Sequence, residues 1–131
     1  MKFSRPVRYG MIAMGHMAKN SDTRCFRTED ISDQYNIPKN VLIKIMNQFV
    51  RAGFLRSKRG PHGGFSLVKS AKEISLLEII EAVNGSLKKI YGIAKQTKKQ
   101  PYAVNMEALC TKAVDQGRAI LQKAKLSDLV K

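Results

Sequence analysis

Apolar residues recur at intervals of three or four in two stretches of the first half of the chain. This spacing is typical of a helix with one buried face. The first stretch predicts a helix over residues 4–19, capped by Ser4, whose buried face consists of Phe3, Val7, Met11, Met14 and Ala18. The second predicts a helix between Pro38 and Gly53, whose buried face consists of Leu42, Ile45, Met46, Phe49 and Val50.

A shorter helix is predicted between these two, over residues 28–36. Thr28 is a suitable N-cap, and Asn36 tolerates the left-handed backbone that ends such a helix. Negative charge in the first turn suits the positive end of the helix dipole and comes from Glu29 and Asp30. The side chains expected to point inward are Ile31 and Tyr35.

The pattern changes to alternation after Gly53. Apolar and basic residues alternate over residues 54–58, a turn rich in glycine follows, and apolar residues return over residues 65–68. This pattern predicts a two-stranded hairpin. Helix, tight turn, second helix and hairpin follow one another in the order of a winged helix-turn-helix. We therefore predict a mainly α fold with a small antiparallel β-hairpin.

Ser75 and Glu78 form a capping-box pattern at the start of a further helix, which ends at Gly85. We expect this helix to pack under the hairpin as part of the scaffold. Residues 1–85 would then form a winged helix-turn-helix DNA-binding domain. Residues 86–104 read as a basic loop, and residues 105–131 as a dimerisation helix with a C-terminal tail.

The last helix carries a long apolar stripe that the winged domain can cover only in part. Its small residues would let a second copy of the helix approach closely, so we predict a homodimer along this helix. The residues expected at the dimer interface are Leu109, Cys110, Ala113, Val114, Gly117, Ile120 and Leu121.

The exposed faces of the second helix and the hairpin are the predicted DNA-binding surfaces. Asn can pair bidentately with adenine, and Lys can donate to guanine or phosphate, so the expected major-groove residues are Lys39, Asn40, Ile43 and Lys44. A basic, glycine-rich tip suits the minor groove, and the wing residues are Arg56, Lys58, Arg59, Gly60, Pro61, His62 and Gly63. The candidate phosphate contacts are Arg5, Arg8 and Thr28. The alternative is that these residues form ordinary solvated faces.

The charge balance points to a polyanionic partner. The 131 residues include 24 Lys and Arg against 10 Asp and Glu, a formal net charge of +14, and double-stranded DNA is the leading candidate. An anionic membrane surface would match the charge too. Because the chain has no membrane-spanning apolar run, no signal peptide and no lipidation motif, we expect a cytoplasmic protein. Catalytic motifs such as GxSxG and HExxH are absent, so we expect no enzymatic activity.

The two cysteines and His16 do not form a recognisable metal or disulfide site. Cys25 and Cys110 are far apart and belong to no CxxC pattern. We interpret Cys110 as a packed core or interface residue, the alternative being a redox-active thiol coupled to DNA binding. Cys25, beside Arg24 and Arg27, is expected to be the more accessible thiol. His16 has no second ligand nearby, so we interpret it as structural rather than metal-binding.

Several segments resemble the Rrf-two family of winged-helix transcription regulators, which includes IscR, NsrR and CymR. They are IPKN at the start of the second helix, LRSKRGPHGGFSL in the hairpin and SLLEIIEAVNG in the helix after it. The resemblance implies a homodimeric bacterial regulator bound to a pseudo-palindromic operator. We expect it to act as a repressor, the alternative being an activator. It also implies Lys39, Asn40 and Lys44 at the major groove and Arg59 in the minor groove. Ile43 stands where iron–sulfur members can carry an acidic residue, and an aliphatic side chain can instead touch a thymine methyl.

The resemblance also bears on cofactors. Members that bind an iron–sulfur cluster group their cysteines in the loop after the capped helix, whereas residues 86–104 contain none and carry Lys88, Lys89, Lys95, Lys98 and Lys99. Aligned from the LSDLV ending, Cys110 falls beyond the expected ligand positions. We therefore expect no cofactor, and the sequence identifies no small-molecule effector. The alternative function is a nonspecific nucleic-acid-binding protein, architectural or RNA-binding, which the charge alone would satisfy.

Overall fold

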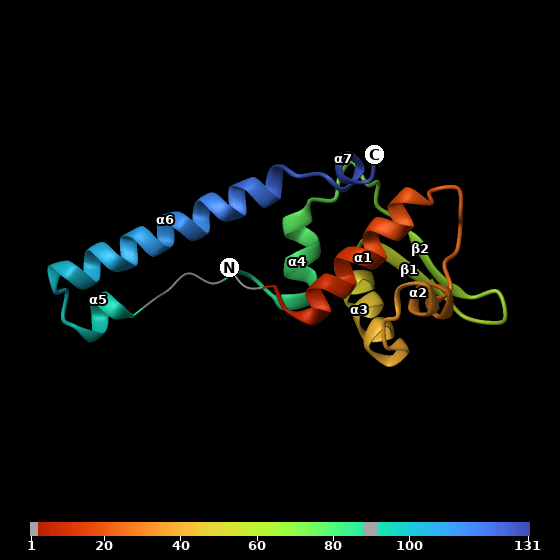
Figure 1. The fold of residues 1–131 in the computed structure, drawn as a ribbon, viewed down its shortest axis with the longest axis horizontal. Helices are drawn as coiled ribbons and strands as arrows, with labels where there is room; N and C mark the ends of the chain where they lie inside the picture. The colour runs from red at the N-terminus through yellow and green to blue at the C-terminus, as the bar shows by residue number, and fades with distance from the viewer. Residues whose placement is uncertain (1–2, 88–91) are drawn as a thin grey trace.

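The computed structural model describes residues 3–87 and 92–131 (Figure 1). The described chain is mainly helical with one two-stranded antiparallel hairpin, as predicted. Its elements are α1 (Arg5–Lys19), α2 (Thr28–Tyr35), α3 (Lys39–Arg51), β1 (Leu55–Lys58), β2 (Gly64–Leu67), α4 (Leu76–Asn84), α5 (Ile93–Gln96), α6 (Pro101–Lys123) and α7 (Leu126–Leu129). α6 extends away from the body formed by the other long elements (Figure 1).

Helix α1 lies at the centre of that body. Ser4 is its N-cap, and the Ser4 hydroxyl accepts a hydrogen bond from the backbone N–H of Val7 at 3.4 Å, as predicted. Gly10 faces α3 and α4 closely, because a Cβ placed there would lie 2.9 Å from Phe49 Cζ and 3.0 Å from Val83 Cγ2. A glycine in mid-helix therefore lets three helices approach one another.

Helix α2 differs from the prediction in its N-cap and in the exposure of Tyr35. Arg27 is the N-cap, and Thr28 is already helical and makes no capping hydrogen bond, so the prediction of Thr28 as the cap was wrong. Asn36 ends the helix with φ 54°, in the left-handed region as predicted. Tyr35, expected to point inward, is 38% exposed, because its hydroxyl lies at the surface 2.7 Å from His16 Nδ1.

Helix α3 has the predicted amphipathic arrangement. Leu42, Ile45, Met46 and Phe49 are buried in the core, and Val50 is half-buried. The helix ends before Gly53, whose φ of 85° lies in the region that favours glycine. The buried face fixes the rotation of α3 about its axis and so determines which residues face solvent.

The hairpin is held to the body by an unpredicted strand-like contact. β1 and β2 pair antiparallel, with Leu55 opposite Leu67. Phe26, in the segment between α1 and α2, forms an isolated antiparallel bridge with Phe65: the two residues exchange backbone hydrogen bonds of 2.7 and 2.8 Å. Both aromatic side chains are buried. The segment before α2 therefore supports the base of the wing.

Helix α4 begins with the predicted capping box, because the Ser75 hydroxyl accepts from the backbone N–H of Glu78 at 3.1 Å. The prediction that α4 packs under the hairpin was wrong. Its buried side chains, Leu77, Ile79 and Ile80, belong to a helix that packs mainly against α1, α3 and α6. The reason is topological: α1 lies between α4 and the hairpin (Figure 1).

Helix α6 begins at Pro101, before the predicted start near residue 105, because a proline suits the first turn of a helix. The region predicted as a basic loop contains α5, and Lys88 and Lys89 lie outside the described residues. Two polar contacts hold α6 to neighbouring segments. Arg118 forms an ion pair with Glu81 of α4, and Glu107 Oε1 accepts a hydrogen bond from the backbone N–H of Gly92, just before α5, at 2.8 Å.

The C-terminal tail returns to the winged domain. Leu126 is buried in the main core, and its backbone N–H donates to the Ile74 carbonyl at 2.8 Å. The backbone N–H of Leu76 donates in turn to the Ala124 carbonyl, also at 2.8 Å. The segment after α6 therefore belongs structurally to the body that contains α1 to α4.

Candidate nucleic-acid interface

The solvent side of α3 presents the residues that the sequence predicts as readers of the major groove. Lys39, Asn40, Ile43 and Lys44 are all exposed, and so are two further polar residues of this face, Asn47 and Arg51. The Asn40 side chain accepts from the backbone N–H of Val41 at 3.1 Å, which leaves its amide N–H donors free to point outward. The face carries three cations, two amides and one aliphatic side chain.

The wing and α3 meet in one hollow of about 370 Å³, called the wing hollow here. Ile43 of α3 lines it together with Lys58, Gly60 and Pro61 of the wing. Arg59, between two of these residues in the chain, is exposed. The exposed surface of α3 and the basic tip of the wing therefore lie on the same side of the molecule, which is the arrangement a duplex requires.

The N-terminal end of α1 adjoins the same surface. Ser4 and Pro6 line a hollow of about 440 Å³ with Asn40 and Lys44 of α3. Arg5, between the first two in the chain, and Arg8 are exposed. The start of α1 therefore lies beside the exposed surface of α3.

Thr28 differs from the other candidate phosphate contacts. It is the first residue of α2 and only 6% exposed, so its hydroxyl has little access to DNA. The backbone N–H groups of the first turn of α2 remain the donors that this end of the helix can offer to an anion. Thr28 also lines the wing hollow.

The wing turn is closed by its own backbone. The N–H of Gly63 donates to the carbonyl of Gly60 at 2.9 Å, with Pro61 and His62 between them, which is a favoured arrangement for a β-turn. Gly60 has φ 107°, and a Cβ at Gly63 would lie 2.3 Å from the Lys58 carbonyl oxygen. The hairpin itself therefore requires glycine at these two positions, in agreement with the prediction of a glycine-rich turn.

A second contact holds the wing to the segment before α2. Gly64 has φ 153°, and a Cβ there would lie 2.2 Å from the Phe26 carbonyl oxygen. The Cys25 thiol contacts the His62 carbonyl oxygen at 3.8 Å and is half-buried. Cys110 is half-buried too, so the expectation that Cys25 is the more accessible thiol stays a prediction. In the sequence, the only signal for this contact is an apolar residue, Phe26, inside a polar segment.

One acidic residue stands among the cations of this surface. Glu29 Oε1 lies 2.7 Å from Lys39 Nζ, and Glu29 Oε2 lies 3.8 Å from Arg27 Nε. The hydrogen bond from Lys39 lowers the pKa of Glu29 below its usual value. The sequence interpretation explained Glu29 by the dipole of α2 alone, because the partner lies across the turn between two helices.

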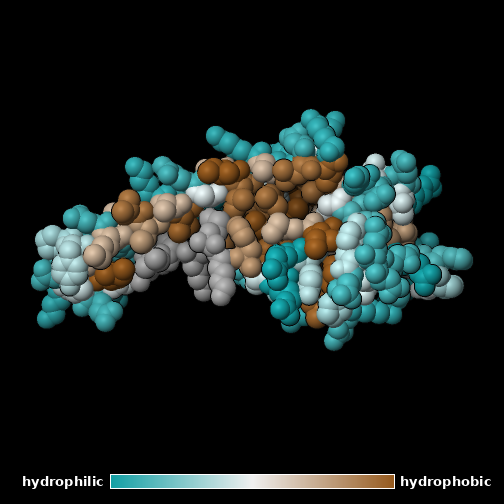
Figure 2. Space-filling view, in the orientation of Figure 1, coloured by the Kyte–Doolittle hydropathy of each residue, from teal (hydrophilic) through white to brown (hydrophobic). Residues whose placement is uncertain are grey.

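The apolar stripe of α6 remains largely uncovered. Leu109 and Ile120 are 69% and 70% exposed, and Ala113 is exposed as well. The other residues of the predicted dimer interface are half-buried against the same chain: Cys110, Val114, Gly117 and Leu121. Apolar surface gathers where α6 joins the body and continues in patches along α6 (Figure 2).

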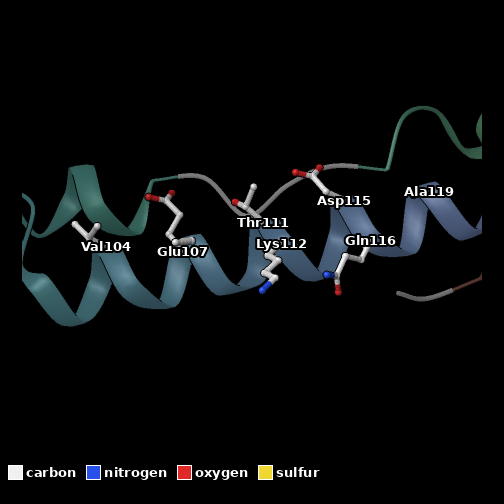
Figure 3. Close-up of a pocket in the computed structure, with 8 residues that line it drawn as sticks. Val104, Glu107, Thr111, Lys112, Asp115, Gln116 and Ala119 are labelled. Atoms are coloured by element: carbon white, nitrogen blue, oxygen red, sulfur yellow. The ribbon is translucent and has the colours of Figure 1, made fainter.

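Another side of α6 mixes apolar and polar side chains, with Val104, Ala108 and Ala119 beside the polar residues. Glu107, Thr111 and Asp115 project on one side of the helix and Lys112 and Gln116 on another (Figure 3). These residues line an open hollow of about 760 Å³.

Metal-binding side chains do not gather in the described part of the chain. In residues 3–87 and 92–131, no group of three or more His, Cys, Asp or Glu side chains is arranged to hold a metal ion. The aromatic rings of Phe26 and Tyr35 pack edge-on against His16, which agrees with its structural interpretation. None of the described helices combines the length and apolar content that crossing a bilayer requires.

Solved structures of similar fold come from several bacteria. Staphylococcus aureus CymR in its oxidized form is 27% identical, with a TM-score of 0.80 over 100% of this chain and 97% of that one. Bacillus subtilis CymR, the global cysteine regulator, is 23% identical, with a TM-score of 0.84 over 99% and 96%. T. potens IscR is 22% identical, with a TM-score of 0.73 over 99% and 86%. The two more distant structures support the fold alone.

Sequence comparison gives the family. A protein of Aquifex aeolicus (strain VF5), an HTH-type transcriptional regulator by name, is 39% identical over 88 residues. The match covers 67% of this chain and 60% of the length of that relative. The Rrf2 family profile, described as iron-dependent transcriptional regulator, matches residues 3–131. Both descriptions are of regulators and neither is of an enzyme, as predicted. This chain belongs to the Rrf2 family of transcriptional regulators.

Proposed function

We propose that this protein is a dimeric, sequence-specific DNA-binding regulator that inserts α3 into the major groove and its wing into the minor groove. The observation that carries the proposal is the wing hollow, in which Ile43 of α3 and Lys58 of the wing face the same space. A duplex laid against this side meets both elements at once. The formal charge of +14 favours the encounter with a polyanion.

The proposed contacts follow from the chemistry of the exposed side chains. Asn40 can accept from and donate to an adenine edge, and Lys39 and Lys44 can donate to guanine acceptors. Ile43 can contact a thymine methyl. Arg59, at the exposed wing tip, suits the negative potential of a narrow minor groove. The basic wing residues Arg56 and His62, together with Arg5 and Arg8 of α1, supply phosphate contacts that position the protein without reading sequence.

We propose that dimerisation occurs along α6. Tyr102, Met106, Leu109 and Ala113 follow one another at intervals of four, three and four residues, and Ile120 extends the same line. All five are exposed in the single chain. Such spacing is typical of a helix that packs against another helix by knobs-into-holes packing. Two copies related by a two-fold axis would present two α3 helices to a palindromic operator.

Repression is the proposed outcome of binding. A dimer seated on a promoter blocks access to the same DNA, and blocking requires no further contact surface. We also propose that the protein acts without an iron–sulfur cluster, although the family is described as iron-dependent. The donor set does not fit a cluster: the chain has two cysteines, and Cys25 lies beside the wing turn whereas Cys110 lies on α6.

The proposal can be tested with DNA selected from a random pool. Fluorescence anisotropy should give an affinity for the selected duplex at least about a thousandfold above that for its scrambled counterpart, with a steep salt dependence. Equal affinity for the two duplexes would refute sequence-specific regulation and favour a nonspecific nucleic-acid-binding role. Protein purified without oxygen should be colourless, and visible absorbance together with bound iron would refute the cluster-free proposal.

A further inference from the structure

Glu29 places a negative charge inside the surface that is proposed to meet DNA. It is held between cations at the start of α3 and the start of α2, 2.7 Å from Lys39 Nζ and 3.8 Å from Arg27 Nε. It also lines the wing hollow with Ile43 and Lys58. Of the residues that line this hollow, Glu29 alone is acidic.

The carboxylate of Glu29 is charged at neutral pH. The hydrogen bond from Lys39 lowers its pKa, and a backbone hydrogen bond in the first turn of α2 acts in the same direction. The positive end of the α2 dipole stabilises the charge further. A phosphate group that approaches Lys39 therefore meets an ammonium already occupied by a fixed anion.

This arrangement affects the two modes of DNA binding differently. Binding to unrelated sequence consists almost entirely of phosphate contacts, so it loses a cation when Lys39 is paired within the protein. In the proposed operator complex Lys39 faces base edges in the major groove, so the affinity for the operator depends less on a phosphate contact from Lys39. Glu29 therefore weakens sequence-independent binding more than operator binding.

We propose that Glu29 is a specificity-determining residue, which suppresses phosphate-only binding by holding Lys39 in an ion pair. The proposal rests on the proposed function, because it requires DNA at this surface. It assigns to Glu29 a role that a helix-capping acid does not have. A capping acid stabilises α2 and leaves the affinity for random DNA unchanged apart from the general effect of net charge.

The test is Glu29→Gln, with Asp30→Asn as its matched control. Both substitutions remove one negative charge from the first turn of α2, and Asp30 is exposed and makes no ion pair with a described residue. Affinities for a random-sequence duplex and for the selected duplex are measured by anisotropy over a series of salt concentrations. Circular dichroism confirms that both variants are folded.

Glu29→Gln should bind the random duplex roughly fivefold more tightly than Asp30→Asn, because Lys39 becomes available to a phosphate. The slope of log affinity against log salt should steepen by about 0.9, the value for one additional phosphate contact. The selected duplex should gain less than the random one. Adding Lys39→Gln to Glu29→Gln should abolish the gain.

Three results would overturn this role of Glu29. The first is equal affinity of Glu29→Gln and Asp30→Asn for the random duplex, which would leave only the effect of net charge. The second is weaker binding by Glu29→Gln, which would mean that Glu29 positions Lys39 for contact. The third is a gain that persists when Lys39 is also changed. Wild-type protein that binds no duplex in a salt-dependent way would instead refute the proposed function itself.

Discussion

Gly10 and Gly15 allow the packing of α1 to be tested within one helix. Both lie in the interior of α1, so replacing either by alanine improves helix propensity by about 1 kcal/mol. A Cβ at Gly15 would meet no atom within 4 Å, whereas one at Gly10 would lie 2.9 Å from Phe49 Cζ and 3.0 Å from Val83 Cγ2. The same substitution should therefore have opposite effects at the two positions.

The magnitude follows from the two opposing contributions. Forcing a methyl group into a packed site costs about 1–3 kcal/mol, and Phe49 is fully buried and cannot move into solvent. Subtracting the propensity gain, Gly10→Ala should destabilise the protein by about 0–2 kcal/mol. Gly15→Ala should stabilise it by up to about 1 kcal/mol. The two variants should thus differ by about 1–3 kcal/mol in free energy of unfolding.

The difference is measurable by urea denaturation followed by circular dichroism, at one protein concentration because dimerisation would contribute to stability. In thermal unfolding it corresponds to roughly 3–5 °C for each kcal/mol. If Gly10→Ala is as stable as Gly15→Ala or more so, the close contact of α1 with α3 and α4 does not constrain the fold, and the packing argument fails.

Three further perturbations test the wing, the dimer and an ion pair. Arg59→Ala should weaken binding to the selected duplex by about 1–3 kcal/mol in anisotropy titrations, whereas Lys112→Ala, with the same charge change on α6, should not. Leu109→Glu should give a monomer by light scattering and lose DNA binding, while Ala108→Glu on a different side of α6 should stay dimeric; a dimeric Leu109→Glu would reject this interface. Burial raises the pKa of Glu81, but hydrogen bonds from Arg118 and backbone outweigh it, so the pKa is lowered from 4.5. The ion pair therefore stabilises the folded protein above pH 4.5 and stabilises it less as the pH falls below that value. In urea denaturation, the free energy of unfolding of the wild type should exceed that of Glu81→Gln above this pH, and the difference should shrink below it.

Local patterns in the sequence predicted the main elements because their causes are local. The apolar spacing of α3 determines its buried side, and the exposed positions of Lys39, Asn40 and Lys44 follow from it. The capping box at Ser75 and the left-handed residue Asn36 mark helix ends through contacts within a few residues. Such features need no knowledge of the rest of the fold.

Contacts between distant segments could not be predicted in this way. The bridge between Phe26 and Phe65 and the pair between Glu29 and Lys39 depend on how α2, α3 and the wing are arranged in space. Tyr35 has the spacing of a core residue, yet its hydroxyl keeps it at the surface beside His16. Chain topology, rather than local preference, decided these positions.

The attachment of α6 at one end has a mechanical consequence. Its 23 residues correspond to a rod of about 34 Å, joined to the body through Glu81 and the Ile74–Leu126 contact. A small rotation imposed at the end of α6 far from the body would be transmitted along the helix and would displace the whole body that carries α3 and the wing. If two copies pair along α6, the angle at which the two helices cross would set the distance between the two α3 helices and hence the operator spacing that they can match.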